Sequence, residues 1–422
     1  MQEMRYSFRY GAGHITVDAD ALASVHEVVP RSAAGQSDVW GAVLSALEHP
    51  VGADSPASSI SDSSTVTVVI DRPSETFPAR EVLAPVLSSL QAKALNPKDI
   101  TILVTHKHDW TCTEDDVNRL LDDPVSRGYR LLLHDPTDGS RLRRVGETPT
   151  SRTPLEVNKS FLEADYKIAL SSIRPDPFAG ATGGGMSILP GLCGQEGIVR
   201  HMRVRATTKN APLAVDSPAG VDMSEAALLV GLDFIVNTVP DWRGSLADIV
   251  SGNPTEAWSR GVESSMALSS VPIPGRSDLV VVSAGGFPFD RTLYDAIDSL
   301  YAAQLGSRRD GVILLIAECA QGLGPKGFAY GVTGTKSEKE VTSMIESKFE
   351  LGMEKARLFW SVNESRNLIL WSELPRSVVT KKLHCSSVHE PQEAMEVARS
   401  YLESGSKATF MPNGRATVLP SA

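Results

Sequence analysis

The chain has 422 residues, which is too long for one ordinary hydrophobic core and therefore predicts two or three domains. Hydrophobic residues make up 41% of the chain and charged residues 22%, as is typical of a globular protein in water. The formal net charge of −10 provides no general positive field for nucleic acid or an anionic membrane, and no stretch holds the ~18 uninterrupted apolar residues of a membrane span.

The first 70 residues predict a β-hairpin, a helix and a buried strand. Residues 4–18 alternate polar and apolar side chains around a G-A-G turn, which indicates the hairpin. Residues 37–48 show helical spacing that ends at His49-Pro50. The β-branched run T-V-T-V-V-I at 65–70 predicts a buried strand of a parallel sheet. Asp71 and Arg72 follow at its carboxyl end, where open α/β sheets bind ligands.

The alternation of helix and strand continues to residue 170. We expect a helix over 77–92 and strands over 100–105, 130–134 and 166–170. H-K-H at 106–108 follows the second strand, and a glycine-rich stretch follows the last one. Because carboxyl ends of parallel strands share one edge, the sequence predicts an active site there. The alternative is that these polar residues only cap and solvate the strand ends.

The stretch from Arg174 to Met202 contains seven glycines within eighteen residues, which argues against a long helix or a paired strand before Ile198. We interpret it as a shaped loop whose consecutive N–H groups suit phosphate or another anion. The alternative is a mobile surface loop, which the interleaved apolar residues disfavour. Candidate cofactor-binding residues are Asp71, Arg72, Thr182, Gly183, Gly184, Gly185 and Met186. Cys193 also lies in this loop, but no C-x-x-C pair indicates a zinc site.

A second strand–helix series begins at residue 279, after an expected linker at 272–276. Strands are expected near 279–283, 311–317 and 368–371, and helices over 291–304, 337–349 and 390–403. The predicted fold class is therefore α/β with mainly parallel sheets. We predict an N-terminal domain at 1–270, a C-terminal domain at 271–405, and a tail at 406–422 that forms a closing strand on either domain.

Taken together, these motifs resemble the nickel-dependent lactate racemase family from Y-G-A-G near the start to M-P-N-G near the end. The similar segments are D-R-P, I-T-I-L-V-T-H-K-H, F-A-G-A-T-G-G-G-M-S-I-L-P-G, G-L-D-F-I-V-N, V-V-V-S-A-G-G-F-P-F-D and A-E-C-A-Q-G-L-G. The resemblance implies two α/β domains with an intervening active-site cleft that holds a nickel pincer nucleotide. In that family a loop lysine tethers the nucleotide, one histidine binds nickel, and two further histidines exchange protons with a 2-hydroxy acid during hydride transfer.

Only some of the family's functional residues have a matching residue in this chain. His108 matches the first catalytic histidine and Arg72 matches a family arginine, whereas Asp176 stands at the position of the second histidine. Met186 replaces the tethering lysine and cannot form the covalent link.

Further departures affect the metal ligand and the second domain. His201 lies one position before the expected nickel ligand, and Met202, a thioether, occupies that position. Phe289, Asp295 and Asp298 stand where polar or basic residues are expected.

The resemblance thus predicts a racemase or epimerase of a 2-hydroxy acid, with a nickel pincer nucleotide bound without a tether. One alternative is a nickel-independent lyase, isomerase or hydrolase that uses His108 and Asp176 as its acid–base pair. The other is a non-catalytic protein that binds a nucleotide or an organic acid. A small anionic substrate is expected from the basic residues Arg72, Lys107, Arg174 and Arg200. We expect a cytoplasmic protein, because residues 1–10 carry charge in place of a signal-peptide core; the oligomeric state is not predicted.

Overall fold

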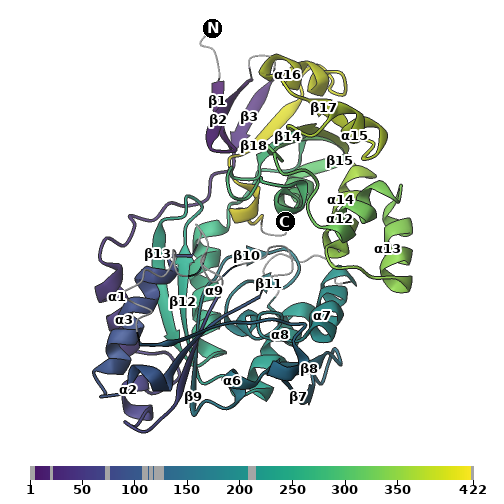
Figure 1. Cartoon of the computed structure of the whole chain (residues 1–422). Helices are drawn as coiled ribbons and strands as arrows, with labels where there is room; N and C mark the ends of the chain where they lie inside the picture. The colour runs from purple at the N-terminus through teal and green to yellow at the C-terminus, as the bar shows by residue number, and fades with distance from the viewer. Residues whose placement is uncertain are drawn as a thin grey trace. The chain divides into compact units, whose positions relative to one another are not determined.

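The computed structural model describes residues 5–19, 22–71, 77–106, 113, 117, 128–207 and 215–419. The chain folds into two compact units (Figure 1). The glycine-loop domain comprises Ser32–Arg174 and Phe178–Leu268, and the C-terminal domain comprises Met1–Arg31, Pro175–Pro177 and Ser269–Ala422. Each contains a mainly parallel six-stranded sheet with helices, which confirms the predicted fold class.

The glycine-loop domain is built on a sheet with the strand order β13-β12-β9-β4-β5-β6. Its parallel strands are β4 (Val66–Ile70), β5 (Ile100–Val104), β6 (Arg130–Leu133), β9 (Tyr166–Ser172) and β12 (Phe234–Pro240). Strand β13 (Leu246–Gly252) closes one end antiparallel to β12. Every residue of β4 and β5 is buried, which is why these strands show no alternation of polar and apolar residues.

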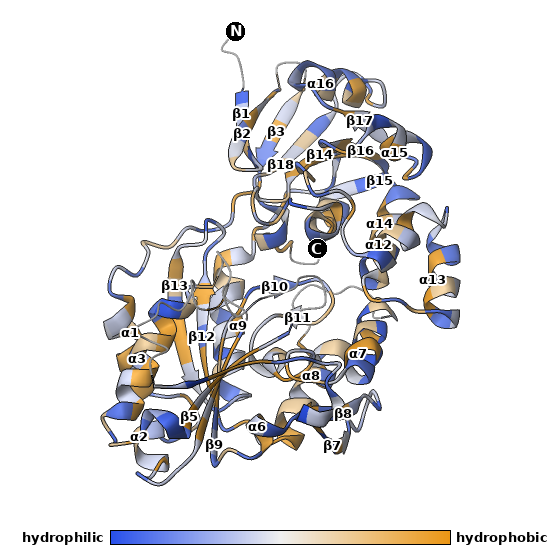
Figure 2. Cartoon of the chain, viewed as in Figure 1, coloured by the Kyte–Doolittle hydropathy of each residue, from blue (hydrophilic) through white to orange (hydrophobic). Residues whose placement is uncertain are grey.

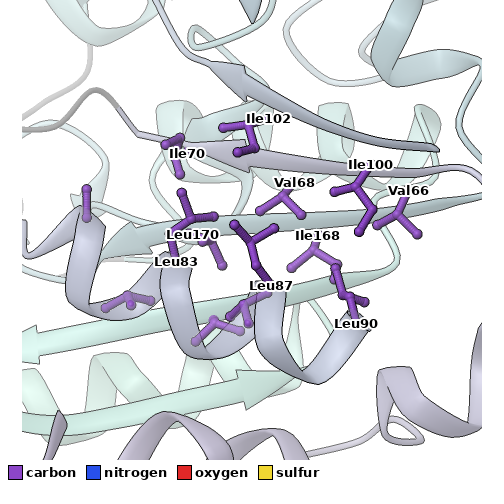
Figure 3. Packing of buried hydrophobic residues seen from close by; sticks show 14 of the residues in the cluster. Val66, Val68, Ile70, Leu83, Leu87, Leu90, Ile100, Ile102, Ile168 and Leu170 are labelled. Carbon is purple, nitrogen blue, oxygen red and sulfur yellow. The ribbon is translucent and has the colours of Figure 1, made fainter. Parts of the chain in front are cut away.

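Helix α3 (Ala79–Gln91) packs against this sheet. Its buried residues Leu83, Leu87 and Leu90 contact the core formed by β4, β5 and β9, as Figure 3 shows. The other elements of the domain are α1 (Val39–Glu48), α2 (Pro56–Ser59), η1 (Pro97–Asp99), η2 (Gly139–Arg141), β7 (Leu142–Glu147), β8 (Pro154–Asn158), α6 (Lys159–Leu162), β11 (Gly180–Ala181), η3 (Gly184–Ser187), α7 (Gln195–Thr207), α8 (Pro218–Leu229) and α9 (Glu256–Ser269).

The C-terminal domain has an all-parallel sheet with the order β17-β16-β15-β14-β18-β3. Its strands are β3 (Ser24–Glu27), β14 (Ser277–Ser283), β15 (Ser307–Ile316), β16 (Asn367–Trp371), β17 (Ser386–Val388) and β18 (Lys407–Met411). The helices are α10 (Leu293–Ala296), α11 (Asp298–Gly306), α12 (Lys326–Thr333), α13 (Glu338–Ser347), α14 (Met353–Asn363), α15 (Arg376–Lys381), α16 (Pro391–Arg399) and η4 (Gly414–Ala416). Figure 2 shows both polar and apolar stretches on α13, whose Val341 and Ile345 are buried.

The two ends of the chain meet in this second sheet. The predicted hairpin forms as β1 (Arg5–Tyr10) and β2 (Gly13–Asp18), and β3 then pairs in parallel with β18. The sequence prediction keeps residues 1–270 together and leaves open which domain the tail strand joins. The structure instead groups residues 1–31 with the C-terminal domain and places the tail strand β18 between β14 and β3, because that is where their backbone hydrogen bonds are made.

The glycine-rich stretch also contains more regular structure than the sequence indicates. The two-residue strands β10 (Pro175–Asp176) and β11 lie within it, and α7 begins at Gln195 instead of near Ile198. A Cβ at Gly197 would lie only 2.5 Å from the carbonyl oxygen of Pro154, so only a residue without a side chain fits at this position of the helix. This glycine therefore serves close packing of α7 and does not break the helix.

Candidate functional site

The glycine loop, residues 178–194, begins at the carboxyl ends of β9 and β12. The Thr182 hydroxyl donates to the Ser172 carbonyl (2.7 Å) and accepts from the Arg174 N–H (3.0 Å). On β12, the buried Asn237 accepts the Gly184 N–H through Oδ1 at 3.0 Å. These bonds fix the start of the loop to two neighbouring strands.

The loop then meets the ends of the three remaining parallel strands. The Ser187 hydroxyl donates to Asp71 Oδ1, just after β4, at 3.1 Å. The His106 N–H, after β5, donates to the Gly191 carbonyl at 3.0 Å. His134, after β6, contacts the Cys193 carbonyl through Nε2 at 2.9 Å. All five strand ends therefore bind one loop, and the structure brings Asp71 together with it. Arg72, Lys107 and His108 lie outside the described residues.

The consecutive glycines of the loop pack closely against the protein itself. A Cβ at Gly185 would lie 2.3 Å from the Met223 carbonyl oxygen of α8, and one at Gly184 would lie 2.8 Å from Trp258 Cδ1 of α9. The Trp258 indole N–H also donates to the Thr182 carbonyl at 3.0 Å. Close packing thus accounts for glycine at these positions without a ligand, which the sequence interpretation does not anticipate.

The N–H groups of the loop are partly engaged in internal hydrogen bonds. Gly184 donates to Asn237, and Met186 donates to the Gly183 carbonyl. In the described part of the chain, the N–H groups of Gly183 and Gly185 donate no hydrogen bond. An anion held by this loop would therefore be bound through these two groups.

Met186 contributes to packing in this structure. Its half-buried side chain lies against a cluster formed by Ala179, Val204, Ala219 and Met223. It carries no amine, so these residues do not fit a covalently tethered nucleotide.

His201 belongs to a fully buried polar network between α7 and α8. Its Nδ1 lies 2.8 Å from Oδ2 of Asp222, whose carboxylate also accepts the hydroxyls of Thr148 (2.6 Å) and Thr153 (2.9 Å). We assign the proton to Nδ1, which gives Nε2 the lone pair that a metal requires. The other predicted ligand, Met202, is buried on the same helix.

The residues around His201 do not form a conventional metal-binding site. Across the described ranges, no group of three or more His, Cys, Asp or Glu residues is placed to hold a metal ion. Burial raises the pKa of the Cys193 thiol, so this sulfur stays protonated and is a poor ligand. Of the predicted metal ligands, His201 alone has a donor nitrogen suited to nickel.

Three other predicted residues have their own local surroundings. Asp176 lies in β10, which belongs to the C-terminal domain and lies next to η4. Arg200 donates through Nε and Nη2 to the Ser151 carbonyl, so its guanidinium serves the local fold. Arg174 is half-buried beside the loop.

His134 is a site residue that the sequence interpretation misses. Asn158 Nδ2 lies 3.3 Å from its Nδ1, while Nε2 contacts Cys193. Burial lowers the pKa of His134 to about 4, so the ring is neutral at pH 7 and donates from Nε2. Its position at the end of a predicted strand is the signal that the sequence offers.

We expect His134 to make the protein less stable in acid. An unfolded histidine binds a proton below pH ~6.5, whereas the folded His134 binds it only near pH 4. Stability should therefore fall by up to about 3 kcal/mol between these pH values. Urea unfolding measures this change. Between pH 7.5 and pH 4.5, the free energy of unfolding should fall less for His134→Gln than for wild type. The exposed His14→Gln is the control; equal losses in all three proteins would contradict the assignment.

Two family models cover most of the chain. The lactate racemase N-terminal domain matches residues 10–212, and the lactate racemase C-terminal domain matches residues 274–419. The chain therefore belongs to the lactate racemase family and is an enzyme of the isomerase class.

Two curated lactate racemases are similar along nearly the whole length. The protein from Thermoanaerobacterium thermosaccharolyticum is 25% identical over 89% of each chain. The protein from Lactiplantibacillus plantarum is 24% identical over 89% of this chain and 90% of the relative.

Solved structures support the same fold. The lactate racemase apoprotein from T. thermosaccharolyticum superposes with a TM-score of 0.89 at 22% identity, covering 99% of this chain and 100% of that one. A protein from Thermotoga maritima gives a TM-score of 0.66 at 14% identity, over 93% and 100% of the two chains. Among the helices described, none is long and apolar enough to cross a membrane.

Proposed function

We propose that this enzyme inverts the C2 carbon of a small 2-hydroxy acid, lactate or a related polyol acid, by hydride and proton transfer. The observation that carries the proposal is the glycine loop, held by all five parallel strand ends in a chain that matches both lactate racemase domains. Ligands of open α/β sheets bind at this edge. Asp71 lies there, and His108 and Arg72 follow the same strand ends in the sequence.

The acid–base roles remain with the residues predicted from the sequence. We assign the proton transfer from the substrate hydroxyl to His108, because an imidazole pKa is well matched to neutral pH. Arg72 would pair with the substrate carboxylate through its guanidinium fork. Asp176 is the second proton-transfer candidate.

The cofactor in this proposal is a nickel pincer nucleotide held without a covalent bond. When bound, it would accept and return the substrate hydride. Asp71, Gly183 and Gly185 would hold its polar groups, and His201 would supply Nε2 as a ligand to the metal. The absence of an amine at Met186 supports exchangeable binding.

Native mass spectrometry tests the cofactor proposal. Protein purified from a host that makes the nucleotide should carry one nickel nucleotide, and acid denaturation should release all of it. A mass adduct that survives denaturation would contradict the non-covalent arrangement, and protein without nickel or nucleotide would exclude this cofactor.

The core packing of Met186 also favours a second candidate, a nickel-independent isomerase or lyase that uses His108 and Asp176. Chiral chromatography of the reaction products distinguishes this second candidate from the racemase proposed above. Enantiopure lactate, glycerate and malate are each incubated with the enzyme, and the opposite enantiomer of one acid should accumulate. Dehydrated product would favour the lyase, whereas binding without any turnover would favour a ligand-binding protein.

A further inference from the structure

The hairpin turn, residues 9–13 between β1 and β2, lies over the carboxyl end of β14 within the C-terminal domain. The Phe287 N–H donates to the Gly11 carbonyl at 2.8 Å, and the Ser283 hydroxyl donates to the Arg9 carbonyl at 2.7 Å. The Gly11 N–H donates to Asp290 Oδ2 at 2.7 Å. Strand β14 pairs with β15 on one side and with β18 on the other, so it is at the switch point where open α/β sheets bind ligands. The hairpin turn therefore covers this edge of the sheet.

The two strands of the hairpin are anchored more firmly than its turn. Phe8 and Val17 are buried in the core of the domain, and the rings of Phe8 and Phe410 lie 5.7 Å apart. The hairpin turn contains no fully buried apolar side chain and is held by the polar contacts described above. Segments with few buried apolar contacts open most readily, so we expect the turn to open while the strands stay in place.

Three carboxylates surround the hairpin turn. Asp290, Glu318 and Glu373 follow the neighbouring strands β14, β15 and β16. The Glu318 N–H donates to Asp290 Oδ2 at 3.2 Å, and the Tyr10 hydroxyl donates to Glu373 Oε1 at 3.0 Å. The Glu318 carboxyl group lies directly against Gly11, because a Cβ on this glycine would be 2.5 Å from Glu318 Cδ. The closed turn thus covers the Glu318 carboxylate and keeps it beside two others.

These surroundings disfavour the ionised form of Glu318. Burial raises the pKa of Glu318, and the negative charges of Asp290 and Glu373 raise it further. Burial and the hydrogen bond to Glu373 raise the pKa of the Tyr10 hydroxyl, which therefore stays protonated and donates. Opening of the turn would let water reach Glu318 and reduce its penalty. Closure of the turn is therefore linked to proton uptake by Glu318.

The other charged groups near the hairpin turn do not neutralise Glu318. Arg9 on the turn and Lys326 at the start of α12 are exposed, so solvent screens their charges. Burial raises the pKa of the Cys319 thiol well above its ordinary value, which keeps it neutral. Other cations at this edge lie in ion pairs of their own: Arg291 with Asp295 at 3.5 Å, Arg376 with Glu393 at 3.0 Å, and Arg415 and Lys355 with Asp298 at 3.7 and 2.9 Å.

We propose that the hairpin turn is a pH-sensitive cover of this sheet edge, which closes when Glu318 binds a proton and loosens when Glu318 ionises. The contribution to closure is fully present below the ordinary glutamate pKa of 4.5 and is lost as the pH rises through the raised pKa of the closed state. The turn should therefore be more open at neutral pH than in mild acid. This control of access is independent of the substrate proposed above.

Hydrogen–deuterium exchange of the full chain, followed by mass spectrometry between pH 5 and pH 8, tests the proposal. Exchange rates are corrected for the intrinsic effect of pH. The Gly11 and Phe287 amides report on the closed turn, because their hydrogen bonds break when it opens. Their protection should fall by roughly threefold to tenfold as the pH rises, the order expected for like-charge repulsion near a surface. The amides of β15 report on the stability of the whole domain and are the internal reference.

Two variants identify the group that responds to pH. Glu318→Gln imitates the protonated acid, so its turn should stay protected at pH 8 and respond little to pH. The matched control Glu364→Gln removes an exposed carboxylate at the end of α14 and should behave as wild type does. Wild-type protection that does not change with pH would overturn the inference. An equal pH response in Glu318→Gln and wild type would also overturn it, as would a response that is lost only in a variant of the exposed His14, His14→Gln.

Discussion

Gly185→Ala should destabilise the glycine-loop domain by about 3 kcal/mol. The added Cβ would lie 2.3 Å from the Met223 carbonyl oxygen and 2.8 Å from its carbon, and these are backbone atoms of α8 that no rotamer change can move. The loop or the helix must shift, and the hydrogen bonds of Gly184 and Ser187 would weaken with it. Urea unfolding at pH 7.5 measures the loss.

Substitutions at two other glycines distinguish the cost of the close contact from the cost of a positive φ. Gly139→Ala adds a Cβ with no atom within 4 Å, so it should change stability little. Gly231→Ala also meets open space, but its φ of +66° should cost about 1 kcal/mol. If Gly185→Ala were as stable as Gly139→Ala, the loop would not be held against α8 as described.

His108→Ala should lower kcat for inversion by about 10² to 10⁴-fold, because a positioned acid–base group contributes this much to a reaction. The expectation comes from the sequence, since His108 follows β5 outside the described residues. Asp176→Asn should have a smaller effect, because an aspartate with a reference pKa of ~3.9 is a weaker base than an imidazole. Initial rates with enantiopure lactate give both values.

The exposed His49→Ala is the control for this experiment and should retain wild-type kcat. Retention of most activity by His108→Ala would remove this residue from the mechanism. If Asp176→Asn were then the inactive variant, the base would be the aspartate, in agreement with the nickel-independent alternative.

The strands were predictable because their residues determine them locally. The run from Val66 to Ile70 is β-branched throughout and apolar apart from Thr67, and such a run indicates a strand buried on both faces. The assignment of segments to domains was harder to predict from the sequence. Nothing in residues 24–27 indicates pairing with residues 407–410, since that contact depends on chain segments nearly four hundred residues apart.

The candidate site was likewise predictable only where short stretches of sequence determine it. The edge carrying Asp71 and the glycine loop followed from the order of strands, and the structure joins them through Ser187. The reason for the glycines did not follow, because Met223 and Trp258 approach from helices far along the chain. His134 was missed for the same reason: its partner, the Cys193 carbonyl, is distant in sequence.

Inversion of enantiopure L-lactate in deuterated water tests the central claim most directly. Hydride transfer to a bound group and back predicts D-lactate that keeps its C2 hydrogen, as mass spectrometry would show. D-lactate that carries deuterium at C2 would mean proton abstraction at carbon and would contradict the hydride mechanism. No D-lactate, from enzyme loaded with the nickel nucleotide, would contradict the assignment of lactate inversion to this enzyme.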